Sequence, residues 1–128
     1  MRDHTKLRAF ILADEVAMLI YQATRRFPKE ELYGLASQMK RAAVSIPSNI
    51  VEGCARESHV EYFRFLEIAF GSLRELDYQC NLAKRLGYFD KLALPGLEAK
   101  IQETGKVLAA LLRSLRPLNN LTANSLTS

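Results

Sequence analysis

Residues 58–76 read Ser-His-Val-Glu-Tyr-Phe-Arg-Phe-Leu-Glu-Ile-Ala-Phe-Gly-Ser-Leu-Arg-Glu-Leu, and this stretch predicts a long amphipathic helix. Its apolar side chains recur at steps of three and four residues, the spacing that places them on one side of a helix. Ser58 and Glu61 have the spacing of a capping box, in which each side chain accepts a free N–H of the first turn. Gly87 is the residue type that commonly follows a helix. We therefore expect a helix from Ser58 to Leu86.

Three further segments show the same periodicity, and none alternates apolar and polar residues as a strand does. The expected helices cover residues 5–26, 31–53 and 91–116. Their connections are short, about four to six residues, and short connections make neighbouring helices run antiparallel. The sequence thus predicts an all-α, up-down-up-down antiparallel four-helix bundle over residues 1–116. Residues 117–128 are rich in Asn, Thr and Ser and are expected to form a flexible C-terminal tail.

The composition is that of one globular domain. The chain has 128 residues, of which 48% are hydrophobic and 25% charged. Its N-terminus has no apolar run of the signal-peptide kind, and no stretch is long enough to span a bilayer. We expect a cytoplasmic protein without a membrane partner. Cys54 and Cys80 are then expected to be buried, reduced side chains.

The apolar face of residues 58–86 is wider than one core requires. Phe63 and Phe70 lie seven residues apart, to one side of the seam formed by Leu66, Leu73 and Leu76. We expect something beyond the monomer core to cover these two rings, which makes them candidate assembly residues.

A polar stripe follows the segment 31–53 at helical spacing, and Glu75 lies beside the apolar seam of the next helix. The simpler interpretation is a solvated face. The alternative is an interhelical network in which Arg41 pairs with Glu52 or Glu75 and the amides hydrogen-bond across, fixing register and oligomeric state. The candidate assembly residues of this stripe are Gln38, Arg41, Asn49, Glu52 and Glu75.

Basic residues gather where the first and third helices end and the second and fourth begin, which is one end of such a bundle. They are Arg25, Arg26, Lys29, Lys84, Arg85 and Lys91. Cations near helix C-termini complement the helix dipole and need no partner. The alternative is a surface for nucleic-acid phosphates, with Tyr33, Tyr88 and Phe89 near enough to stack on unpaired bases. The net charge of +4 permits such a partner without requiring one.

Signals of catalysis are weak. The chain has two histidines, and it contains no phosphate-binding glycine loop, Cys-x-x-Cys or His-Glu-x-x-His motif. Glu52, Cys54 and His59 are the one group of ligand-type residues, and their spacing matches no common metal site. We expect neither an enzyme nor a cofactor or metal site.

A set of short motifs between residues 7 and 115 resembles a known family. They are Phe27-Pro28, Glu31, Tyr33-Gly34-Leu35, Gln38, Arg41-Ala42-Ala43, Ser45-Ile46-Pro47-Ser48-Asn49-Ile50, Glu52-Gly53, Glu61-Tyr62, Arg64-Phe65-Leu66, Ile68-Ala69, Gly71-Ser72-Leu73, Glu75-Leu76 and Leu86-Gly87-Tyr88. With these motifs the chain resembles the bacterial 23S rRNA intervening-sequence protein family, and the run Ser45 to Gly53 is the most specific of them.

The resemblance implies a four-helix bundle that assembles as a homopentamer and has no catalytic activity. It also implies a connection with RNA, because some genes of the family lie within insertions of 23S rRNA genes. The accessory protein of diversity-generating retroelements is similar in architecture, and there a basic pentamer binds a reverse transcriptase and its RNA. Two functions are therefore expected: a homo-oligomeric module associated with RNA, or a protein-interaction scaffold that docks a partner enzyme such as a reverse transcriptase.

Overall fold

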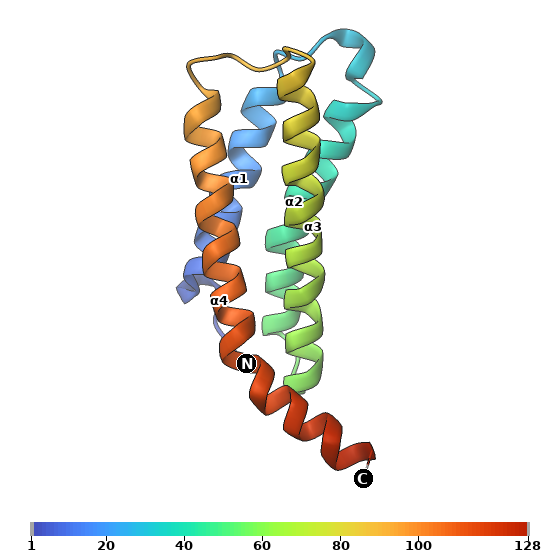
Figure 1. Cartoon of the computed structure of the whole chain (residues 1–128), viewed down its shortest axis with the longest axis vertical. Helices are drawn as coiled ribbons and strands as arrows, with labels where there is room; N and C mark the ends of the chain where they lie inside the picture. Colours follow the sequence, from blue (N-terminus) through green and yellow to red (C-terminus); the bar gives the residue numbers. More distant parts are fainter. Residues whose placement is uncertain (1, 128) are drawn as a thin grey trace.

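Figure 1 shows the fold as a computed structural model, which describes the backbone of residues 2–127 and the side chains of residues 2–116. Four long helices lie side by side along the long axis of the molecule. The elements are η1 (His4–Lys6), α1 (Arg8–Thr24), η2 (Lys29–Glu31), α2 (Leu35–Cys54), α3 (His59–Arg85) and α4 (Leu94–Thr127), where η marks a 3-10 turn. No strand occurs among the described residues, so the prediction of an all-α protein with four helices is confirmed.

Three helices begin a few residues later than predicted, for local reasons. Leu7 is extended and separates α1 from η1. Residues 29–31 form η2, and α2 begins after Gly34 with the Leu35 N–H donated to the Glu31 carboxylate at 3.0 Å. In α4 the first turn holds Pro95, a position where the N–H that proline lacks has no partner inside the helix.

The C-terminal end of α4 also differs from the sequence expectation. Its backbone is helical as far as Thr127, past the end expected near residue 116. The flexible tail predicted for residues 117–128 lies outside the residues whose side chains are described, and it stays a prediction.

Both ends of α3 follow the sequence prediction. Ser58 is the N-cap, and its hydroxyl accepts the Glu61 N–H at 3.3 Å. At the other end Gly87 has a φ of +76°, the left-handed conformation in which glycine carries no steric penalty. The Gly87 N–H donates to the Lys84 carbonyl at 3.0 Å and the Tyr88 N–H donates to the Ala83 carbonyl at 3.1 Å. These two bonds form a Schellman motif, which satisfies the last free carbonyls of α3.

The core lies between all four helices. Each helix packs against two others: α1 against α2 and α4, and α3 against α2 and α4. The largest fully buried side chains are Val16, Ile20, Met39, Ile46, Ile50, Cys54, Leu66, Leu76, Thr104 and Leu108. The ring of helices therefore closes through the α1–α4 contact and shares one core.

The prediction that Phe63 needs cover from beyond the monomer is wrong. The Phe63 side chain is only 5% exposed, and the Arg116 guanidinium of α4 lies 5.9 Å from its ring centre. The apolar face of α3 is wide because α3 packs against two helices, α2 on one side and α4 on the other. Phe70, two turns further along the same helix, remains half-buried.

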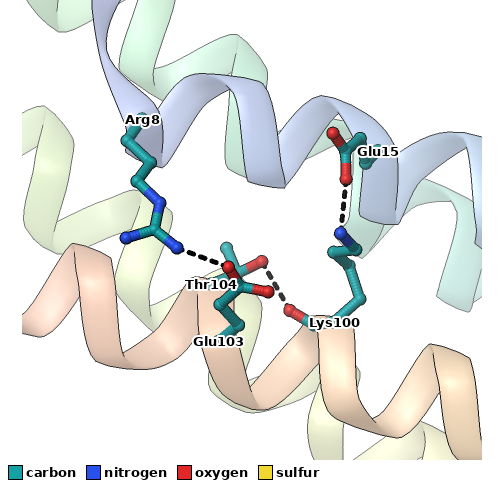
Figure 2. A network of polar contacts seen from close by, with 5 residues as sticks. All are labelled: Arg8, Glu15, Lys100, Glu103 and Thr104. Carbon is teal, nitrogen blue, oxygen red and sulfur yellow. Dashed lines mark hydrogen bonds and ion pairs between the residues drawn. The ribbon is translucent and has the colours of Figure 1, made fainter.

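Polar side chains also join α1 to α4 along the surface of this contact, as Figure 2 shows. Lys100 donates to the Glu15 carboxylate at 2.6 Å, and Arg8 pairs with Glu103. The hydrogen bond to Glu15 raises the pKa of Lys100. Thr104 is buried between these pairs and donates its hydroxyl proton to the Lys100 carbonyl at 2.7 Å. Because exposed ion pairs are worth little, the buried apolar contacts supply most of the stabilisation here.

We expect Gly87→Ala to lower the free energy of unfolding by about 1–2 kcal/mol, because an alanine must adopt the left-handed conformation there. Urea denaturation followed by circular dichroism measures the change. Gly96→Ala is the control, since a Cβ at that helical position meets nothing within 4 Å and should leave stability equal or higher. Equal stability of Gly87→Ala and the parent chain would contradict the assignment of this helix end.

Candidate nucleic-acid interface

The α1–α2 and α3–α4 connections lie at the same end of the molecule, at the top of Figure 1, and an aromatic clamp joins them. The clamp consists of the rings of Phe27, Tyr88 and Phe89. The ring centre of Phe27 lies 5.3 Å from that of Tyr88 and 5.4 Å from that of Phe89. Tyr88 also donates its hydroxyl proton to the Glu31 carboxylate at 2.9 Å, and this bond raises the pKa of Tyr88. The clamp brings two connections that are far apart in the sequence to one surface.

The six cations predicted for nucleic-acid binding are all exposed, and we call their surface the basic end. It consists of Arg25, Arg26, Lys29, Lys84, Arg85 and Lys91. The structure divides them into two groups by their partners. Arg26 pairs with Asp90 at 3.4 Å and Lys84 with Glu98 at 3.1 Å. Within the described side chains, no ion pair involves the remaining four.

A pocket of about 300 Å³ opens on the α1–α2 side of the basic end. Arg25, Lys29 and Lys40 line it, and no carboxylate of the described residues does. We call it the cationic pocket. The rest of its wall consists of Tyr21, Thr24, Phe27, Pro28, Leu32 and Ala36. The same buried Phe27 ring thus holds the clamp together and forms part of this pocket.

Lys40 and Tyr21 were not among the candidate residues predicted from the sequence. The Lys40 ammonium lies 5.5 Å from the centre of the Tyr21 ring, so the two side chains meet across the α1–α2 contact. Tyr21 precedes Arg25 by one helical turn, a spacing that places both on one side of α1 and could have indicated Tyr21. Lys40 gave no such signal, because its position beside α1 depends on how the two helices pack.

The three aromatic residues predicted to stack on bases have different environments. Tyr88 and Phe89 are half-buried parts of the clamp, so they anchor the α3–α4 connection. Tyr33 is 93% exposed, and it follows Leu32 of the cationic pocket in the chain. Of the three, Tyr33 alone presents an open ring at this end.

The predicted polar network forms only in part, along the α2–α3 contact. Gln38, Arg41 and Glu75 line one shallow pocket with Ser45 and Ser72. The Ser45 and Ser72 hydroxyls are hydrogen-bonded at 2.8 Å, and the Asn49 amide donates to the Ser45 carbonyl at 2.8 Å. This pocket and its bonds are called the polar seam below.

The ion pairs predicted for Arg41 do not form within the described chain. Glu52 pairs with Arg56, one turn further along, because the chain continues helically to Cys54 and keeps the two side chains adjacent. Glu75 accepts a hydrogen bond from the Gln79 amide at 3.3 Å. Arg41 is exposed beside the polar seam, where its guanidinium remains available to a second molecule.

A groove with an apolar floor runs along the α3–α4 contact. One of its two pockets has a volume of about 280 Å³, and the adjoining one, of about 350 Å³, shares Phe70, Ala109 and Arg113 with it. The cations along the two pockets are Arg74, Lys106, Arg113 and Arg116, and the acids are Glu67 and Asp77. Phe70, the second ring predicted to be an assembly residue, lies in this groove.

Residues that could serve metal binding are not brought together. No group of three or more His, Cys, Asp or Glu side chains suited to a metal occurs among the described residues. Burial raises the pKa of Cys54 and raises that of Cys80 to about 12. A ring nitrogen of His59 lies 3.3 Å from the Leu115 carbonyl, so the contact recorded for His59 is with the backbone of α4.

The described helices also contain no segment long and apolar enough to cross a membrane.

Comparison with known proteins identifies the family. The model of the 23S rRNA-intervening sequence protein family matches residues 5–110, which form most of the chain. The chain belongs to this family. A crystal structure of a protein of unknown function from the S23 ribosomal protein family of Bacteroides thetaiotaomicron VPI-5482 has a TM-score of 0.73. It is 20% identical and the match covers 82% of this chain and 95% of that one, so the fold is shared. No curated protein matches the chain.

The position of Gly53 explains one motif by which the chain resembles the 23S rRNA-intervening sequence proteins. Gly53 is buried inside α2, next to the start of α3. A Cβ there would lie 2.9 Å from Cβ of Phe65 and 3.4 Å from the Tyr62 ring. The absent side chain therefore lets α2 and α3 approach closely at this point. Ser45 and Asn49, which belong to the same motif, contribute to the polar seam further along α2.

We expect Arg41→Ala to leave the stability of the single chain within about 0.5 kcal/mol, because the residue is exposed and unpaired within the described side chains. If Arg41 instead contacts a second copy, the variant should lose oligomeric mass at the same concentration. Light scattering after size exclusion measures the mass and urea unfolding measures stability. An unchanged mass and an unchanged midpoint together would remove Arg41 from the assembly residues.

Proposed function

We propose that this protein is a non-enzymatic, homo-oligomeric four-helix module that associates with RNA through its basic end. The observation that carries the proposal is the set of cations there that no carboxylate of the described chain neutralises, above all Arg25 and Lys29. The helix dipole accounts for Lys84 and Arg85, which lie in the last turn of α3. It does not account for Lys29, which precedes α2. The family's name, which refers to an intervening sequence of 23S rRNA, supports RNA as the anion.

The proposal includes the finer expectations about architecture and location. The helices run up-down-up-down and antiparallel, which is supported by the α1–α2 and α3–α4 connections lying together at the clamp end. These connections cover residues 25–34 and 86–93 and are longer than the four to six residues expected. The chain assembles as the homopentamer that the resemblance implies, and it does so in the cytoplasm, the location expected from the sequence. Assembly supports RNA association, because five copies present five basic ends to one polyanion.

RNA association predicts a steep dependence of affinity on salt. Purified protein titrated with a labelled structured RNA should bind at near-physiological salt and bind a duplex DNA of the same length less well. The double variant that carries Arg25→Gln and Arg85→Gln should weaken RNA binding. The steepness of the fall of log K with log salt should decrease by about 0.7–0.9 for each phosphate that the protein no longer neutralises.

The matched control is Lys6→Gln with Arg64→Gln, two exposed cations outside the basic end. Removal of these two charges should change the slope less than removal of Arg25 and Arg85. Binding seen only at low salt, equal for RNA and DNA and equally weakened by both variants, would show that the basic charge is incidental.

Homo-oligomer formation is expected to use the α3–α4 groove. Phe70→Glu places a charge on its apolar floor and should dissociate the oligomer, as measured by light scattering after size exclusion. Tyr78→Glu is the control, because Tyr78 is exposed on the same helix and does not line the groove. An unchanged mass for both variants would contradict this location of the subunit interface.

A protein-interaction scaffold is the second candidate function, and the same groove favours it. If the purified chain is monomeric, the groove and its four cations are left for a partner enzyme such as a reverse transcriptase. The partner should then be recovered in a fixed ratio, resist nuclease treatment and be lost with Phe70→Glu.

A further inference from the structure

We propose that the cationic pocket holds a backbone phosphate of unpaired RNA and that Tyr33 stacks on a neighbouring base. The inference rests on the proposed association with RNA and adds the place of contact and the kind of strand. Four observations support it: the asymmetry of charge at the basic end, the positions of the cations along their helices, the size of the pocket and the exposure of Tyr33.

The two sides of the basic end differ in charge. On the side toward α4, Arg26 lines a pocket together with its own partner Asp90, and Lys84 pairs with Glu98. Arg85 and Lys91 have no ion pair among the described side chains, but neither of them lines that pocket. On the α1–α2 side, Arg25, Lys29 and Lys40 share a pocket without a carboxylate of the described chain. Like charges that share a pocket repel each other unless an anion joins them. The cationic pocket is thus the part of the basic end that an anion would stabilise most.

Helix dipoles do not explain this arrangement. Arg25 is the C-cap of α1, so the negative end of that helix favours it. Lys29 begins η2, and Lys40 lies in the second turn of α2, near the positive end of that helix. Ala36 of the first turn of α2 also lines the pocket, so the N-terminal end of α2 adds positive potential there. The dipole therefore favours one of the three cations and does not account for the other two.

The carboxylates of η2 do not compensate the pocket. Both Glu30 and Glu31 belong to η2, and neither lines the pocket. Glu31 accepts hydrogen bonds from the Leu35 N–H and the Tyr88 hydroxyl, which direct it toward the clamp. In addition, the Tyr21 ring lies beneath the Lys40 ammonium and helps to hold that cation at the pocket.

The dimensions of the site favour an unpaired strand. A volume of about 300 Å³ suits one phosphate with its sugar and is too small for the continuous backbone track of a duplex. Tyr33 is 93% exposed and next in sequence to Leu32 of the pocket wall. A tyrosine ring stacks on the face of a base, and that face is accessible only when the base is unpaired and unstacked.

The test uses a labelled ten-nucleotide oligouridylate and a duplex RNA of ten base pairs, at near-physiological salt. The pocket variant carries Arg25→Gln, Lys29→Gln and Lys40→Gln. The charge-matched control carries Arg26→Gln, Lys84→Gln and Arg85→Gln, from the same end but outside the pocket. The pocket variant should bind the oligouridylate at least about tenfold more weakly, with a salt slope lower by about 0.7 for each phosphate no longer neutralised. The control should lose distinctly less affinity, because its cations add to the general attraction of the basic end without holding the phosphate.

Tyr33→Ala is expected to weaken binding of the oligouridylate about fivefold or more while leaving binding of the duplex unchanged. Tyr33→Phe keeps the ring and should restore the affinity. A circular-dichroism melt of each variant separates loss of binding from loss of folding, since all of these side chains are exposed or half-buried.

Equal losses of affinity in the two triple variants would overturn the pocket and leave the wider RNA association standing. Equal losses of single-strand and duplex binding with Tyr33→Ala would overturn the stacking interaction. If the parent protein binds neither RNA, or binds only anionic phospholipid vesicles, then the RNA association itself fails together with this inference.

Discussion

The packing of α3 is the constraint on which the rest of the structure depends. Its apolar face is too wide for one neighbour, so α2 and α4 must both pack against it, and α1 closes the ring. Gly53 permits the close approach of α2 to α3, and the buried Phe63 ring lies on the side toward α4. Burial of apolar surface drives this packing, so the wide apolar face, and not the polar contacts, decides which helices are neighbours.

The basic end follows from that packing through the clamp. The connections that follow α1 and α3 lie at the same end of the molecule, and there Phe27 packs against Tyr88 and Phe89. The clamp uses the aromatic residues that were candidates for base stacking, which leaves Tyr33 exposed. It also brings Asp90 to Arg26, so that cation has an acidic partner, while no carboxylate of the described residues lines the cationic pocket on the α1–α2 side. The clamp thus holds Tyr88 and Phe89 in a structural contact and leaves Tyr33 accessible to a ligand.

The helices and their caps could be predicted because their signals are local. Ser58 and Gly87 mark the ends of α3 through bonds that span four to six residues of chain, and the structure confirms both. The start of α2 was predicted too early, because the Glu31 carboxylate caps Leu35 and draws the preceding residues into η2. The expectation for Phe63 failed because periodicity gives the width of an apolar face and does not tell how many helices cover it.

The sequence by itself determined the class of fold, the four helices and the presence of six cations at one end, because helical periodicity and the order of the helices are properties of the chain alone. Only the tertiary structure decided which cations have acidic partners, that Lys40 of α2 joins Arg25 of α1, and that Glu52 pairs with Arg56 and leaves Arg41 exposed. These outcomes depend on how helices are rotated and set against each other. That rotation is fixed by the burial of the whole core, which no short stretch of sequence contains.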